Sequence, residues 1–97
     1  MSIGFIATIR VQPGKAAEFE AAFGKLQAAI RANEKGCLQF DLFKSKDEDD
    51  SYVVYEQYVD AAAFDAHSAA PHARELGAAV APTLAGRPTL AAYTKIS

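Results

Sequence analysis

Residues 37–59 read CLQFDLFKSKDEDDSYVVYEQYV, two apolar stretches separated by charged residues. In the first stretch, Leu38, Phe40 and Leu42 alternate with other side chains, which is the period of a β-strand that buries one face. The second stretch, residues 51–59, is rich in aromatic and β-branched side chains, which strands favour. The five residues between them are all charged and suit a solvated connection. This part of the chain therefore predicts a β-hairpin.

An alternating strand and an amphipathic helix precede the hairpin. Residues 3–11 (IGFIATIRV) place an apolar side chain at every second position, and Pro13-Gly14 then marks a turn. Residues 15–33 carry apolar side chains at steps of four, three and four, at Phe19, Phe23, Leu26 and Ile30. Because that spacing places them on one stripe, it predicts an amphipathic helix.

Helical sequence and a last strand follow the hairpin. Asp60 is a suitable N-cap for a helix over the alanine-rich residues after it. Pro71 can start a further helical segment, since proline is tolerated in the first turn, and residues 89–96 alternate again as a strand. The order β-α-β-β-α-β predicts a ferredoxin-like α+β fold, with both helices on one face of a four-stranded antiparallel sheet.

The chain of 97 residues has the length of one domain, and we expect a single domain over residues 1–97. Alanine supplies 21 of its apolar residues, which leaves few side chains large enough to fill a core. The sheet face away from the helices would carry apolar side chains such as Ile6 and Phe43. Because a bare apolar face is more often an interface than a solvent surface, we expect a homodimer in which two sheets cover each other.

Charge and hydropathy exclude several classes of partner. The 10 Lys and Arg residues are interspersed with 12 Asp and Glu residues, so no basic stripe exists and we expect no nucleic-acid partner. No apolar run approaches the roughly 20 residues of a membrane helix, and we expect no membrane partner. The single cysteine, Cys37, cannot form an intramolecular disulfide. Together with the lack of a leader pattern, this predicts a cytoplasmic protein.

Two histidines are the strongest candidates for chemistry. His67 follows Phe64 by three residues and His72 precedes Leu76 by four, so both lie on the inward stripes of their helices. They are either half-buried core histidines that hydrogen-bond to backbone groups, or proton acceptors at the rim of a cavity. Their spacing is not that of a zinc-binding helix, and we expect no metal site.

Glu56 and Tyr58 share one face of the strand over residues 51–59. A carboxylate in so apolar a strand needs a partner. It either forms a salt bridge with Arg or Lys across the sheet or the dimer, or it is a hydrogen-bonding group for a ligand or for one of the histidines.

Several segments, taken in order, resemble the antibiotic biosynthesis monooxygenase family. They are residues 33–41 (NEKGCLQFD), residues 55–58 (YEQY), and Asp60 with Phe64, His67, Pro71 and His72. The likeness covers nearly the whole chain at the family's spacing. It implies a dimeric α+β barrel with a pocket between helices and sheet in each subunit. Members include cofactor-independent oxygenases of polyphenols and quinols, haem-degrading enzymes, and a small isomerase of a signalling sugar derivative.

The haem-degrading branch of the family is known for an Asn on the first strand, a Trp on the third and a haem-ligating His in the last helix. This chain has no Trp, Tyr58 stands at the Trp position, and the histidine position falls near Gly77. No glycine-rich loop that cradles a phosphate is present either. We therefore expect a protein that needs no metal, haem or flavin.

The resemblance implies a cofactor-independent monooxygenase of a small aromatic phenol, hydroquinone or polyphenol, with molecular oxygen as co-substrate. Ground-state oxygen is a triplet, so the substrate must become an electron-rich anion. The protein then needs a base, a hydrogen bond to the oxyanion and a dry cavity. We expect His67 or His72 to be the base. The residues expected to bind the substrate are Asn33, Phe40, Glu56, Tyr58 and Phe64.

Two alternatives remain open at this point. One is an isomerase of a small carbonyl compound that uses the same histidines without oxygen. The other is a non-catalytic ligand-binding dimer.

Overall fold

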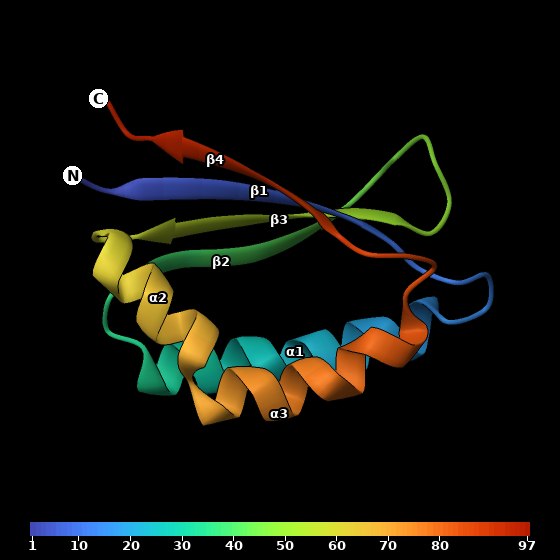
Figure 1. Ribbon diagram of the computed structural model, residues 1–97. Coiled ribbons are helices and arrows are strands. Elements are labelled where there is room, and N and C mark those ends of the chain that lie inside the picture. Colours follow the sequence, from blue (N-terminus) through green and yellow to red (C-terminus); the bar gives the residue numbers. More distant parts are fainter.

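The computed structural model describes residues 1–97 and shows a four-stranded sheet with the helices gathered on one side of it (Figure 1). The elements are β1 (Ile3–Arg10), α1 (Ala16–Asn33), β2 (Cys37–Lys44), β3 (Ser51–Tyr58), α2 (Ala61–Ala69), α3 (Pro71–Val80), the short 3-10 helix η1 (Ala81–Thr83) and β4 (Thr89–Thr94). The strands pair antiparallel in the order β2-β3-β1-β4. This arrangement confirms the predicted ferredoxin-like fold.

The main core lies between the sheet and α1. Phe19, Phe23 and Ile30 of α1 are buried, as their spacing predicts, and Leu26 packs partly buried against them. Burial of each such large side chain contributes about 1.5–3 kcal/mol. The inward residues of the sheet that meet this stripe are Ala7, Ile9, Val11, Phe40, Tyr52 and Val54.

The second helical region is divided in two, as Pro71 predicts. The side chain of Asp60 caps α2 by accepting a hydrogen bond of 2.8 Å from the backbone N–H of Ala63. Ala70 is extended, with φ −65° and ψ 133°, because the residue before a proline avoids the helical region. The chain therefore turns between α2 and α3, and each helix can direct one histidine at the same point.

The start of β2 differs from the prediction. Its pairing with β3 shifts between Cys37 and Gln39, which inserts one extra residue into β2. Leu38 is consequently 54 % exposed, and Cys37 packs against the core in its place. The expectation that Leu38 shares the inward face with Phe40 was therefore wrong, since one extra residue reverses the alternation of a strand.

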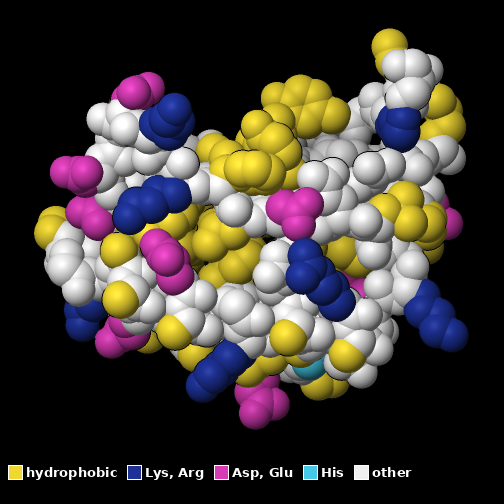
Figure 2. All heavy atoms as spheres, turned by 180° about the vertical axis from the view of Figure 1, so that it is seen from behind, with side chains coloured by type: hydrophobic (Ala, Val, Ile, Leu, Met, Phe, Trp, Pro, Cys, Tyr) yellow, Lys and Arg dark blue, Asp and Glu magenta, His cyan; other side chains and the backbone are white.

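The sheet face opposite the helices is bare. Phe43, Tyr55 and Tyr93 are exposed there, and the rings of Phe43 and Tyr55 lie 5.0 Å apart between centroids. Seen from behind, apolar side chains reach the surface on the sheet side of the molecule (Figure 2). All three exposed side chains lie on strands. None of the helices has the length and apolar character of a segment that spans a lipid bilayer.

Candidate active site

One carboxylate lies between the two predicted histidines. Nδ1 of His67 is 2.9 Å from Oε1 of Glu34, and Nε2 of His72 is 2.5 Å from its Oε2. The side chains are largely buried, with exposed fractions of 10 % for Glu34, 16 % for His67 and 22 % for His72. The structure thus brings both histidines together through a residue that the sequence analysis did not select.

The ends of three helices create this cluster. Glu34 is the C-cap of α1, where its backbone N–H donates to the carbonyl of Ile30 and its carbonyl accepts from the N–H of Cys37. His67 lies in the last turn of α2 and His72 in the first turn of α3. Nowhere are three or more His, Cys, Asp or Glu side chains arranged to hold a metal ion. The cluster is a set of hydrogen bonds between its own members.

Three of the predicted pocket residues surround the ring of His67. The ring centroids of Tyr58, Phe40 and Phe64 lie 5.5, 5.8 and 6.3 Å from it. Phe5, which was not predicted, stacks on Phe64 at 4.2 Å and meets Tyr58 edge-on at 5.9 Å. No hollow of the structure is lined by His67, Tyr58 or Phe64. Aromatic rings therefore occupy the place where the resemblance implies a pocket.

Glu56 has a tyrosine as its partner. The hydroxyl of Tyr58 donates a 2.7 Å hydrogen bond to Oε1 of Glu56, and Glu56 forms no salt bridge within the chain. Burial raises the pKa of Glu56, although the hydrogen bond from Tyr58 and the nearby His67 act in the opposite direction. Burial and the adjacent Glu56 raise the pKa of Tyr58. The hydroxyl hydrogen of Tyr58 thus lies between two side chains of β3, next to the ring of His67.

Cys37 adds a thiol close to this cluster. Its Sγ donates to the carbonyl of Gln39 at 3.4 Å. Burial, together with the neighbouring Glu34, raises the pKa of Cys37 to about 11. The thiol is therefore protonated at neutral pH, which suits a packed strand residue and not a nucleophile.

Asn33 lies apart from the aromatic rings. Its side-chain amide donates a 2.8 Å hydrogen bond to the carbonyl of Ala29 in its own helix. It borders a surface hollow of about 230 Å³ together with Glu34 and His72. Among the predicted substrate-binding residues, Asn33 is thus the one placed at the surface.

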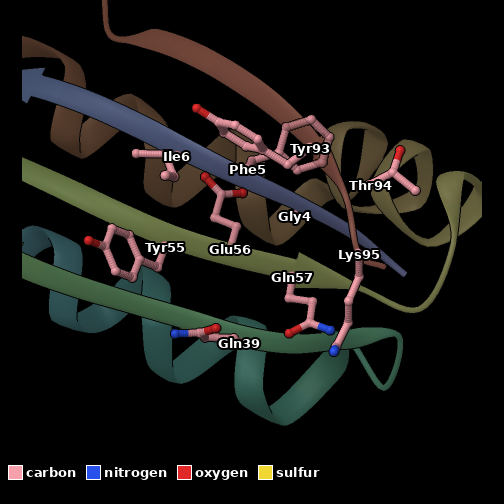
Figure 3. Close-up of a pocket in the computed structure, with 10 residues that line it drawn as sticks. All are labelled: Gly4, Phe5, Ile6, Gln39, Tyr55, Glu56, Gln57, Tyr93, Thr94 and Lys95. Atoms are coloured by element: carbon pink, nitrogen blue, oxygen red, sulfur yellow. The ribbon is translucent and has the colours of Figure 1, made fainter. Parts of the chain in front are cut away.

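A different hollow, of about 300 Å³, lies on the sheet face away from the histidines (Figure 3). Its lining comes from all four strands and includes Ile6, Tyr55, Gln57 and Tyr93, together with the predicted substrate-binding residue Glu56. No histidine lines it. This hollow belongs to the bare apolar face.

Sequence reasoning missed Glu34 and Phe5. One signal for Glu34 was available, because two half-buried imidazoles need a hydrogen-bond partner and a carboxylate is a common one. Glu34 also stands inside the segment of residues 33–41 that carries the family resemblance. Phe5 was recognised only as one of the alternating apolar residues of the strand expected over residues 3–11.

Comparison with known proteins agrees with this fold. The sequence profile of the antibiotic biosynthesis monooxygenase family matches residues 2–79. The proposed monooxygenase YcnE of Bacillus subtilis (strain 168) is 36 % identical over 66 residues, which is 68 % of each chain. A proposed antibiotic biosynthesis monooxygenase from Caulobacter crescentus CB15 superimposes with a TM-score of 0.95 at 42 % identity, over 99 % of this chain and 91 % of that chain.

A second solved structure is that of SnoaB, a cofactor-independent oxygenase from Streptomyces nogalater. It superimposes with a TM-score of 0.85 at 26 % identity, over 99 % of this chain and 94 % of that chain. Fold, family profile and sequence identity point the same way. The chain belongs to the antibiotic biosynthesis monooxygenase family.

Proposed function

We propose that this protein is a cofactor-independent monooxygenase of a small aromatic phenol, hydroquinone or polyphenol, with a histidine as the base. The observation that carries the proposal is the pair of histidines on Glu34, set against the rings of Phe40, Tyr58 and Phe64. Membership of a monooxygenase family supports the class of reaction. The similarity to SnoaB, described as a cofactor-independent oxygenase, supports the absence of a cofactor.

The chemistry needs no external reductant. A neutral imidazole takes the proton of the substrate hydroxyl, and the resulting phenolate transfers electrons to oxygen. One oxygen atom enters the ring, as a carbonyl when a phenol reacts and as a hydroxyl when a hydroquinone reacts, and the other leaves as water. A phenol with a free para C–H thus gives a quinone, and a hydroquinone gives a hydroxyquinone. The substrate supplies all the electrons, while the protein supplies the base, orienting hydrogen bonds and exclusion of water.

In this proposal, His67 or His72 provides the base, and Phe40 and Phe64 flank the flat substrate by aromatic stacking. Tyr58 and Glu56 orient its oxygens from β3, and Asn33 contributes from the surface hollow. The rings must separate to admit a substrate. Displacing α2 should cost the least free energy, since no residue of α2 is fully buried.

We further propose that the protein acts as a homodimer with molecular oxygen and one small aromatic substrate as its other partners. The bare sheet face presents exposed aromatic side chains and a shallow hollow. A second copy would cover both, and a stable interface buries at least about 1,200 Å² in total.

The test is oxygen uptake by the purified protein with a panel of phenols, hydroquinones and polyphenols, with and without chelator. We expect uptake without added cofactor, and incorporation of one labelled atom from ¹⁸O₂ into the product. His67→Ala or His72→Ala should lower turnover by about 10²–10⁴-fold, whereas Ser68→Ala on the exposed side of α2 should not.

Three results would contradict the proposal. Stoichiometric metal or flavin, or activity abolished by chelation, would exclude a cofactor-free reaction. A product of unchanged mass formed without oxygen would identify an isomerase. Tight binding of a ligand without turnover would indicate a binding protein.

A further inference from the structure

We infer that His67 is the base of the reaction, that Glu34 is its positioning residue, and that His72 anchors the same carboxylate. The base role of His67 depends on the proposed function. The pairing of Glu34 with two imidazoles depends only on the geometry of the three side chains.

The direction of the hydrogen bonds decides which ring nitrogen is free. An ionised carboxylate only accepts hydrogen bonds, so each imidazole nitrogen that faces it carries a hydrogen atom. His67 directs Nδ1 at Glu34, and His72 directs Nε2. In the neutral rings, the lone pairs therefore lie on Nε2 of His67 and on Nδ1 of His72.

The surroundings of the two rings differ. The ring of His67 lies among three aromatic rings, where a flat substrate would stack. Neither Nε2 of His67 nor Nδ1 of His72 has a protein partner, and because no fully buried side-chain nitrogen or oxygen lacks one, both atoms reach the surface. His72 instead borders the surface hollow with Asn33, away from the three aromatic rings around His67. His67 is consequently the better placed base.

Two carboxyl groups lie near the ring of His67. Glu34 is in direct contact with it, and Glu56 lies nearby on β3. Around His67, the titratable groups on the packed elements are Glu34 after α1, Cys37 of β2, Glu56 and Tyr58 of β3, and His72 of α3.

Close packing of a glycine sets the position of Glu34. A Cβ added at Gly36 would lie 2.6 Å from the Cβ of Ala63 on α2, a distance that forces one of them to move. The carbonyl of Gly36 also accepts a 2.9 Å hydrogen bond from the N–H of Val59. The loop after α1 therefore touches α2 only two residues beyond Glu34, which holds the carboxylate within reach of His67.

The pairing can be tested without any substrate, by nitrogen NMR of the histidine rings. We expect neutral His67 to be the Nδ1–H tautomer and neutral His72 the Nε2–H tautomer. Glu34→Gln should remove the preference of His67 for the Nδ1–H tautomer, because an amide can donate a hydrogen bond as well as accept one. The control Glu18→Gln, on an exposed part of α1, should change neither ring. A wild-type His67 in the Nε2–H form, or one unaffected by Glu34→Gln, would overturn the pairing.

The role of each residue can be tested by turnover. Glu34→Gln should lower kcat by about 10²-fold or more while KM changes little, since the carboxylate acts through His67 and not on the substrate. Both glutamine variants keep an amide donor for Glu34, but only His67→Gln removes the base, so its kcat should fall about tenfold or more below that of His72→Gln. Equal losses in the two glutamine variants would overturn the assignment of His67 as the base.

A compensating pair tests the packing. Gly36→Ala should disturb the His67 tautomer and lower kcat, and a second change, Ala63→Gly, should restore both. Failure of the second change to rescue would contradict the role of this contact. If the tautomers are as expected but no phenol consumes oxygen, the base assignment falls together with the proposed function, and the pairing stands.

Discussion

The two faces of the sheet are made of alternating residues from the same four strands, yet the helices of the chain cover only one of them. Toward the helices, Phe5, Ala7 and Ile9 of β1 are buried. On the opposite face, Tyr55 and Tyr93 remain 42 % and 55 % exposed. One chain has enough helix to cover one face, and the side chains of the other face stay exposed.

The difference also explains where chemistry can occur. On the covered face, polar groups are removed from water, so each needs a partner, and no buried side-chain nitrogen or oxygen lacks one. Low polarity around Glu56 and Tyr58 raises their pKa values and strengthens their hydrogen bond. On the bare face, no histidine lines the hollow. We therefore associate reaction with the covered face and assembly with the bare face.

The largest expected effect on stability comes from removing a buried side chain on the covered face. Phe19 is fully buried, so Phe19→Ala should lower the free energy of unfolding by about 3–5 kcal/mol. Tyr93→Ala, on the bare face, should change the stability of the monomer by less than about 0.5 kcal/mol. Urea denaturation at several protein concentrations measures both. Similar losses in the two variants would contradict the contrast between the faces.

The next largest effect concerns the bare face. Ile6→Glu places a charge at its centre, and in a dimer two such charges meet across the interface. We expect the dissociation constant to rise by about 100-fold, whereas Ala78→Glu, on an exposed part of α3, should leave it unchanged. Sedimentation velocity reads both. A wild-type protein that sediments as a stable monomer at micromolar concentration would refute the homodimer.

A smaller effect should appear at alkaline pH on the covered face. Burial and the hydrogen bond to Glu20 raise the pKa of Tyr52 from 10.0 to about 12. The unfolded chain therefore loses this proton first, so the contribution of Tyr52 to stability is complete below pH 10 and is lost as the pH rises through about 12. Tyr52→Phe should flatten this part of the stability profile. A profile that falls equally steeply in the variant would contradict the prediction.

The smallest effect is expected at Glu56. Because burial raises its pKa in the folded state, its contribution to stability is greatest in acid and is lost as the pH rises through that raised value. Glu56→Gln should therefore be as stable as wild type in acid, and more stable at neutral pH by no more than about 1 kcal/mol. Thermal unfolding at the two pH values checks this. Destabilisation at neutral pH would contradict the prediction, because it would mean that the partners of the carboxylate outweigh its burial.

The elements themselves were predictable, because burying one face imposes a period on residues close together in the chain. The helix expected over residues 15–33 is found at Ala16–Asn33. The inward positions of Glu56 and Tyr58 also follow from the strand parity that they share with Val54. The same alternation mispredicts the direction of Leu38. The bulge at this point arises from pairing with β3, and the apolar pattern of β2 alone does not reveal it.

The site was only partly predictable. The sequence alone determined the order of the elements, the stripe that faces the sheet, and the presence of two inward histidines near aromatic residues. Only the tertiary structure decided that Glu34 joins these histidines, that Asn33 lies at the surface, and that aromatic rings fill the expected pocket. The physical reason is distance along the chain. Periodicity is a property of neighbouring residues, whereas the partners of Glu34 lie 33 and 38 residues away and meet it only when the ends of three helices converge.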